Sequence, residues 1–369
     1  MDVQANLSTS NAQTSPAAAV DPAQLLARLH SRALVQFDGQ ASLASAAVGV
    51  LVQQGHAAAI GHVMRRDEAA TPAWHPTEAA DLFSAVPGGE RDWGRWMRRM
   101  QRDVARQGVA GALQTWLPTL MDGVVGAGFA GLLRTAQAVR WAQRVPGGAG
   151  ADEVARGLAL WAVTHQSLPG EVAADALHPS TLESMDVLET LAFVPADLRT
   201  TGTWQDHLSQ LHTHAPWETS VARMWFEPRS LQSACTVLAD FAAEQVLLNF
   251  ATADAYARVL AAVSALRTLA EVVDERLLMH HLPDFFKAVA AVHAVCGRET
   301  ALAESALVRR DAEETPRQAE QWQERAATLA DPAVVLVVDA AQREARVGGH
   351  PVLLEAAALM VRRSERLQK

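Results

Sequence analysis

Three glycines near the middle of the chain have a spacing that binds dinucleotide phosphates in some folds. Gly126, Gly128 and Gly131 fit the pattern G-x-G-x-x-G within the stretch "GAGFAGLLR". That chemistry needs a β-strand before the glycines, a helix that begins among them, and an acidic residue roughly 20 positions later. Pro118 interrupts the segment before the glycines, and helical character follows them instead of a second strand. We therefore interpret the glycines as small residues that let a neighbouring helix approach closely.

Histidines are the second group of residues that could do chemistry, as metal ligands or as acids and bases. His207, His212 and His214 are spaced as H-x4-H-x-H, whereas metal-binding helices place ligands three or four residues apart on one face. We expect this segment to be a helix end that runs into a loop. His165 ends an apolar helix, where an imidazolium can meet the carbonyl end of the helix. His293 is on an apolar helix and is expected to be a core residue.

The sequence around these residues is dominated by amino acids that favour helices. Ala, Leu, Arg, Gln and Glu are abundant, strand-like alternation is nearly absent, and Pro or Gly separates the apolar-periodic segments. Asp21 and Pro22 predict a helix start, because an aspartate cap is followed by proline at the first helical position. Further helical patterns cover 92–109, 108–118, 124–144, 151–166, 180–193, 203–213, 229–250, 252–273, 283–297, 316–329, 332–346 and 351–367.

These patterns predict an all-α protein whose helices are antiparallel and surround a central pocket. Residues 1–21 are polar and low in complexity, so we expect a disordered tail there. Residues 22–369 are expected to form one domain, because no Gly/Ser linker divides them and their length suffices for one large core.

Composition argues against several classes of function. The net charge is −9, so no overall basic field suggests a nucleic-acid partner. Two cysteines cannot make a disulfide framework, and a cytoplasmic location fits them. The N-terminal stretch lacks the basic start and apolar run of a signal peptide. The most apolar run, "AVVLVVDAA", is too short to cross a bilayer, so we predict no membrane partner.

Several longer segments, taken in order, resemble those of a known family. The stretch "GVAGALQTWLPTLMDGVVGAGFAGLLRTAQAV" is similar to the signature region of the questin oxidase-like family. Four other stretches resemble the family's remaining motifs: "FDGQASLASAAVGVLVQQG", "LALWAVTHQSLPG", "FATADAYARVLAAVSALR" and "DPAVVLVVDAAQREARVGGHP". The motifs are in the family's order, and the resemblance covers about residues 22–367.

The resemblance implies an all-α oxidoreductase. Members of this family resemble enzymes that open anthraquinone-type polyketide rings with molecular oxygen, in a formally Baeyer–Villiger-like step. Their motif histidines and a closing lysine are polar groups brought together in a buried pocket. Imidazoles at such positions suit a divalent iron site, so the family pattern implies iron as cofactor and an aromatic polyketide-like substrate.

This chain departs from the family at each of those positions. The histidines fall on Leu43 and Ala130, near Arg258, and on Ala333, and the lysine falls on Leu336. Leucine and alanine cannot coordinate a metal or move a proton. Lys287 is the one lysine that could substitute, and it belongs to a different predicted helix. The resemblance therefore predicts a scaffold that has lost its iron site, and we expect no cofactor.

Three hypotheses about function remain open. In the first, the protein performs no metal chemistry and acts as a binding or partner protein. In the second, it is a metal-free oxidoreductase: Arg134 steers a phenolate or carboxylate of an aromatic polyketide-like substrate, Arg258 adds positive charge, and His165 acts as acid or base. Arg134 could instead form an ion pair within the fold. In the third, the chain is a helical module whose exposed apolar patch binds a partner protein.

Overall fold

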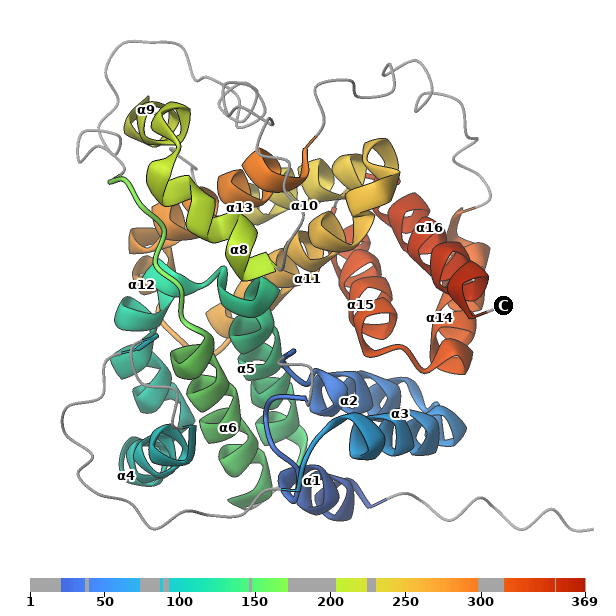
Figure 1. Cartoon of the computed structure of the whole chain (residues 1–369). Helices are drawn as coiled ribbons and strands as arrows, with labels where there is room; N and C mark the ends of the chain where they lie inside the picture. Colours follow the sequence, from blue (N-terminus) through green and yellow to red (C-terminus); the bar gives the residue numbers. More distant parts are fainter. Residues whose placement is uncertain are drawn as a thin grey trace, which may run out of the picture.

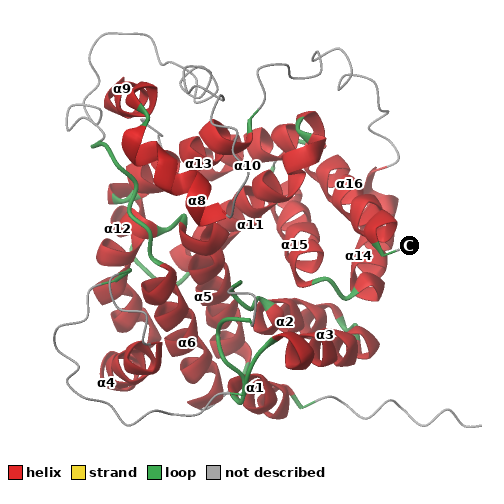
Figure 2. Cartoon of the chain, in the orientation of Figure 1, coloured by secondary structure: helices red, strands yellow, loops and turns green. Residues whose placement is uncertain are grey.

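A computed structural model shows that the chain is built of helices (Figure 2). The structure describes residues 21–36, 40–73, 87–88, 93–145, 148–171, 204–223, 230–297, 315–348 and 350–368. These residues form α-helices, short 3-10 helices and loops without any β-strand, and their strand-like pairings are two isolated bridges. The expected all-α class is confirmed. The antiparallel arrangement around a central pocket, and the single domain over residues 22–369, stay predictions.

The first described helices are α1 (Pro22–His30), α2 (Ala44–Gln54) and α3 (Ala57–Ala70). Asp21 caps α1, because its side chain accepts a hydrogen bond of 2.9 Å from the N–H of Ala23. The predicted start of this helix at Pro22 is therefore confirmed. Of the predicted tail, residues 1–20 lie outside the described residues.

The G-x-G-x-x-G glycines bring two helices close together. They belong to α5 (Gly126–Arg144), which packs tightly against α6 (Gly148–Thr164). A Cβ atom at Gly131 would lie 2.3 Å from the Cα of Trp161 in α6, closer than two carbon atoms can approach. A 3-10 helix, Met121–Gly123, stands before the glycines where a dinucleotide fold has a strand. The interpretation as helix-contact residues is confirmed for Gly126 and Gly131, which face Thr164 and Trp161 of α6.

The remaining helices include α11, which packs against α5, α10 and α15 (Figure 1). They are α4 (Trp93–Leu120), α8 (Trp204–Gln210), α9 (Ala215–Arg223), α10 (Leu231–Leu248), α11 (Ala253–Ala270), α12 (Glu275–His280), α13 (Leu282–Cys296), α14 (Thr315–Leu329), α15 (Pro332–Arg346) and α16 (Val352–Leu367). The patterns predicted at 252–273 and 332–346 correspond to α11 and α15. The helix predicted at 180–193 lies outside the described residues.

One cluster of buried apolar side chains joins these helices into a common core. Trp96, Trp161 and Trp217 are among its largest members, and each is almost completely buried. Within the described ranges, no helix taken singly has both the length and the apolar composition needed to cross a bilayer. In the described part of the chain, one pair of helices, α10 and α11, satisfies those criteria together, and that pair is bent by 114°.

Candidate functional site

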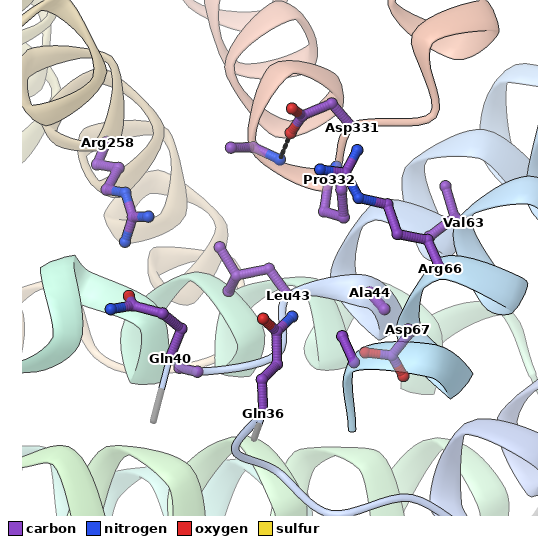
Figure 3. A pocket seen from close by; sticks show the side chains of 13 residues that line it. Gln36, Gln40, Leu43, Ala44, Val63, Arg66, Asp67, Arg258, Asp331 and Pro332 are labelled. Atoms are coloured by element: carbon purple, nitrogen blue, oxygen red, sulfur yellow. Dashed lines mark hydrogen bonds between the residues drawn. The ribbon is translucent and has the colours of Figure 1, made fainter. Parts of the chain in front are cut away.

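A pocket of about 260 Å³ opens where five parts of the chain meet. Its walls come from α2, α3, α11, the first residues of α15 and the loop before α2 (Figure 3). The lining residues are Gln36, Gln40, Ala41, Leu43, Ala44, Val63, Arg66, Asp67, Ala70, Arg258, Asp331, Pro332 and Ala333. The pocket thus combines an apolar floor with two arginines, two aspartates and two amide side chains.

Two helices begin at the wall of this pocket. Asp331 caps α15 by accepting a hydrogen bond of 3.0 Å from the N–H of Ala333, and Pro332 is the first helical residue. Leu43 stands at the cap position of α2 and offers no side-chain hydrogen bond there. Because a helix N-terminus carries a partial positive charge, both helix starts favour negative charge in the space before them.

Arg258 reaches the pocket from α11 and is seated by the unusual backbone at the start of α5. Its Nη1 donates to the carbonyl oxygen of Ala127 at 3.3 Å. Gly128 adopts φ +64°, and a Cβ atom there would lie 2.7 Å from the same Nη1. Burial lowers the pKa of Arg258, while the charges of Asp254 and Asp331 act in the opposite direction. The second glycine of the G-x-G-x-x-G pattern therefore leaves room for the side chain of Arg258.

Asp67 occupies the opposite side of the pocket from Arg258 in Figure 3. Its side chain is buried, and Oδ1 accepts a hydrogen bond of 2.6 Å from the hydroxyl of Ser42. Arg66 is exposed beside it on α3. The sequence analysis singled out neither residue. The available signal was weak, because Ser42 and Asp67 become neighbours only when α3 folds back along α2.

The positions that the resemblance aligns with metal-binding side chains are only partly brought together. Leu43, Arg258 and Ala333 line this pocket, although they come from three different helices or helix starts. Ala130 is fully buried inside α5 and is not part of the pocket lining. Leu336 lines a second cavity of about 20 Å³ between α5, α11 and α15. The structure therefore gathers three of the five positions at one place.

Arg134, which we predicted to steer a substrate, has a different role in the fold. Its Nε and Nη2 donate to the two carboxylate oxygens of Glu153 at 2.9 and 3.2 Å, and its side chain is 3% exposed. His30 contacts the same carboxylate, with 2.8 Å between Nε2 and Oε2. Burial disfavours the charged form of Glu153, but these cationic partners outweigh burial and hold its pKa below the ordinary range. Arg134 is absent from the pocket lining, so the ion-pair interpretation is the one confirmed.

His165, predicted as an acid or base, also lies away from the pocket lining. Its Nε2 is 3.2 Å from the carbonyl oxygen of Thr119, in the last turn of α4. The expectation that this ring meets a helix's carbonyl end is right, but the helix is α4 and not α6, which His165 follows. Burial lowers the pKa of His165, and the charge of Asp122 partly offsets that effect.

Two other residues named from the sequence are also accounted for by contacts within the fold. The Lys287 Nζ is buried near the carbonyl oxygens of Leu168 and Gly170, at 3.5 and 3.4 Å. Lys287 therefore links α13 to the segment that follows α6. His293 is partly buried on α13, and its Nδ1 is 2.9 Å from the hydroxyl oxygen of Tyr256, so its ring has a partner within the fold as expected.

The described side chains do not fit the iron site that the family resemblance implies. Leu43, Ala130, Ala333 and Leu336 have no lone pair to offer a metal. Within the described ranges, no three His, Cys, Asp or Glu side chains are grouped closely enough to hold a metal ion. His207, His212 and His214 lie where α8 ends and a 3-10 helix leads into α9, which agrees with the predicted helix end.

Comparison with family models, with curated proteins and with solved structures finds no significant match to this chain.

Proposed function

We propose that this chain is a questin oxidase-like protein that keeps a small-molecule pocket but not the family's metal chemistry. The observation that supports this proposal best is the convergence of Leu43, Arg258 and Ala333 on one pocket. Positions that surround a common ligand must lie together in the fold, even when they are far apart in the sequence. Two of these positions carry hydrocarbon side chains, so the pocket offers space where the family pattern has imidazoles.

The pocket suits a small aromatic molecule with an acidic group. Leu43, Val63 and Pro332 provide apolar surface for a ring, and Arg258 provides a guanidinium for a carboxylate or phenolate. Pockets that enclose drug-sized ligands measure roughly 300–1,000 Å³. The volume of about 260 Å³ is below that range and favours a polyketide-like compound of one or two rings.

The contacts of the candidate residues favour a small-molecule-binding protein over a metal-free oxidoreductase or a helical interaction module. A metal-free oxidoreductase would need Arg134 and His165 near its substrate, and both are engaged elsewhere. An interaction module would need a continuous exposed apolar patch. The large exposed apolar side chains among the described residues are Phe250, Val347 and Leu367, on separate elements. We place the protein in the cytoplasm, where its two buried free cysteines can stay reduced.

A blocked pocket tests this proposal. Purified full-length protein is titrated with 1-naphthol and 4-hydroxybenzoate by calorimetry, and we expect at least one to bind. Ala333→Phe places a ring in the pocket and should abolish binding, whereas Ala58→Phe changes an exposed alanine of α3 and should leave it intact. Equal binding by both variants would contradict the proposed pocket. Stoichiometric iron in the purified protein would contradict the proposed loss of metal chemistry.

A further inference from the structure

The pocket has chemically different ends, and this feature identifies the class of ligand more closely. In the view of Figure 3, Arg258 and Gln40 lie on one side of Leu43, and Asp67 lies on the other. Arg258 comes from α11 and Asp67 from α3. Arg258 therefore lies at one end of the cavity and Asp67 at the other, with apolar Leu43 between them and exposed Arg66 beside Asp67.

The Arg258 end has donors to spare for an anion. A guanidinium has five N–H donors, and the described contacts of Arg258 include one hydrogen bond, to the Ala127 carbonyl oxygen. The nearby charges of Asp254 and Asp331 favour its charged form against burial, and neither is among its described hydrogen-bond partners. A carboxylate placed against two N–H groups would compensate the desolvation of this side chain, because paired charges are tolerated where lone ones are not.

The Asp67 end has an acceptor to spare. Oδ1 takes the hydroxyl hydrogen of Ser42, whereas Oδ2 has no hydrogen-bond partner among the described residues. An ionised carboxylate accepts and does not donate. A ligand hydroxyl or amine can therefore be received at Oδ2. Asp331 is less suited to that role, since it already caps α15 through Ala333.

The charges around the pocket argue against a metal cation as its ligand. Arg66 and Arg258 both line the cavity, and two helix N-termini add partial positive charge. Two arginines would repel a divalent ion from Asp67 and Asp331, whereas an organic anion gains from them. A ligand that suits this pocket therefore carries one negatively charged group and one hydrogen-bond donor.

We propose that the pocket binds small aromatic carboxylates that carry a hydroxyl or amine on the ring, with the carboxylate on Arg258 and the donor group on Asp67. This assignment rests on the proposed function, because it names the ligand of the same pocket. Leu43 and Pro332 contact the faces of the ring. Discrimination then comes from both ends, since a ligand lacking either group leaves a buried charge unpaired.

A series of four compounds tests the assignment on the wild-type, full-length protein. Calorimetric titrations use 4-hydroxybenzoate, 3-hydroxybenzoate, benzoate and 1-naphthol. We expect the better hydroxybenzoate to bind at least about tenfold more tightly than benzoate and 1-naphthol, which is the scale of a hydrogen bond to a charged group. If benzoate binds as tightly as both hydroxybenzoates, the Asp67 contact is wrong. If 1-naphthol alone binds, the carboxylate assignment is wrong while the proposed pocket stands.

Variants at the two ends give a second readout. Asp67→Asn should lower hydroxybenzoate affinity about tenfold and so erase the preference over benzoate. Arg258→Gln should erase the preference for carboxylates over 1-naphthol, with correct folding checked by circular dichroism. Arg65→Gln is the matched control, because Arg65 neighbours Arg66 on α3 but does not line the pocket. Loss of hydroxybenzoate binding in this control would overturn the assignment, and so would retention of both preferences in the end variants. If none of the four compounds binds the wild type, the proposed function fails together with this inference.

Discussion

The buried Glu153 carboxylate should be among the most sensitive positions for stability, and the substitution Glu153→Gln tests this. The carboxylate is 1% exposed and receives two hydrogen bonds from Arg134 and one contact from His30. Glutamine keeps the shape but removes the negative charge. The guanidinium of Arg134, itself 3% exposed, is then left without its counter-charge in the interior.

The expected cost follows from this burial. Removing one partner of a buried ion pair costs about 3–5 kcal/mol, because the remaining charge stays desolvated. With an m value of about 3 kcal/mol per molar urea, the unfolding midpoint would drop by roughly 1–1.7 M. The exposed pair Arg28–Glu68, with 59% and 38% exposed side chains, provides the matched control. Glu68→Gln should cost no more than about 1 kcal/mol, since solvent screens that pair.

Urea unfolding followed by circular dichroism at pH 7 measures both variants. The double variant Arg134→Met, Glu153→Gln should recover part of the loss, because the charge of Arg134 is then removed together with its partner. A loss below about 1 kcal/mol in Glu153→Gln would refute the reasoning. So would an Arg134→Met protein of unchanged stability that no longer binds hydroxybenzoates, since Arg134 would then serve the ligand.

The same carboxylate gives the wild type a defined response to acid. Because the folded pKa of Glu153 is lowered, its contribution to stability is present above the ordinary pKa of 4.5 and is lost as the pH falls below that value. The wild type should therefore lose stability below about pH 4.5 more steeply than Glu153→Gln does. Parallel urea curves for the two proteins between pH 5 and pH 3 would contradict the assigned pairing.

Three further predictions concern other buried groups. Gly128→Ala should lower stability by about 1–2 kcal/mol, since φ is +64° and the new methyl would lie 2.7 Å from Arg258 Nη1; thermal unfolding measures the loss. Burial lowers the pKa of His293 from 6.5 to about 4, so wild-type stability should fall by up to about 1.4 kcal/mol per unit as the pH drops through that window. His293→Phe should lack this dependence, and an identical pH profile would contradict it. Burial raises the thiol pKa of Cys235 and Cys296 to about 12; a disulfide reagent should label them only after unfolding, and rapid labelling of native protein would be contrary.

The helices could be predicted where a local signal defines them. Asp21 followed by Pro22 predicted the start of α1, and the pattern at 332–346 matched α15, which begins after Asp331 in the same way. Capping and apolar periodicity act within a few residues, so the sequence contains them completely. Gly126 and Gly131 of α5 were interpreted correctly for a related reason: without a preceding strand, close helix packing explains them, whereas the role of Gly128 beside Arg258 was not predicted.

The candidate site was less predictable, because its side chains are positioned by contacts between distant segments. Arg258 was named from the sequence and does line the pocket, whereas Arg134 and His165 do not. Arg134 pairs with Glu153, which is 19 residues away in the sequence, and His165 contacts Thr119, which is 46 residues away. Asp67 was missed because its neighbour Ser42 lies 25 residues earlier.

Sequence alone determined which chemistry the chain can offer at the resemblance positions. The side chains of Leu43, Ala130 and Ala333 carry no lone pair in any conformation, so no arrangement of helices could make those side chains metal ligands. Tertiary structure decided which charged groups remain available to a ligand. A buried charge needs a partner. Helix packing places Glu153 against Arg134, whereas Arg258 lies at the pocket wall with one described hydrogen bond, to Ala127. That difference depends on which surfaces meet, and the order of residues does not reveal it.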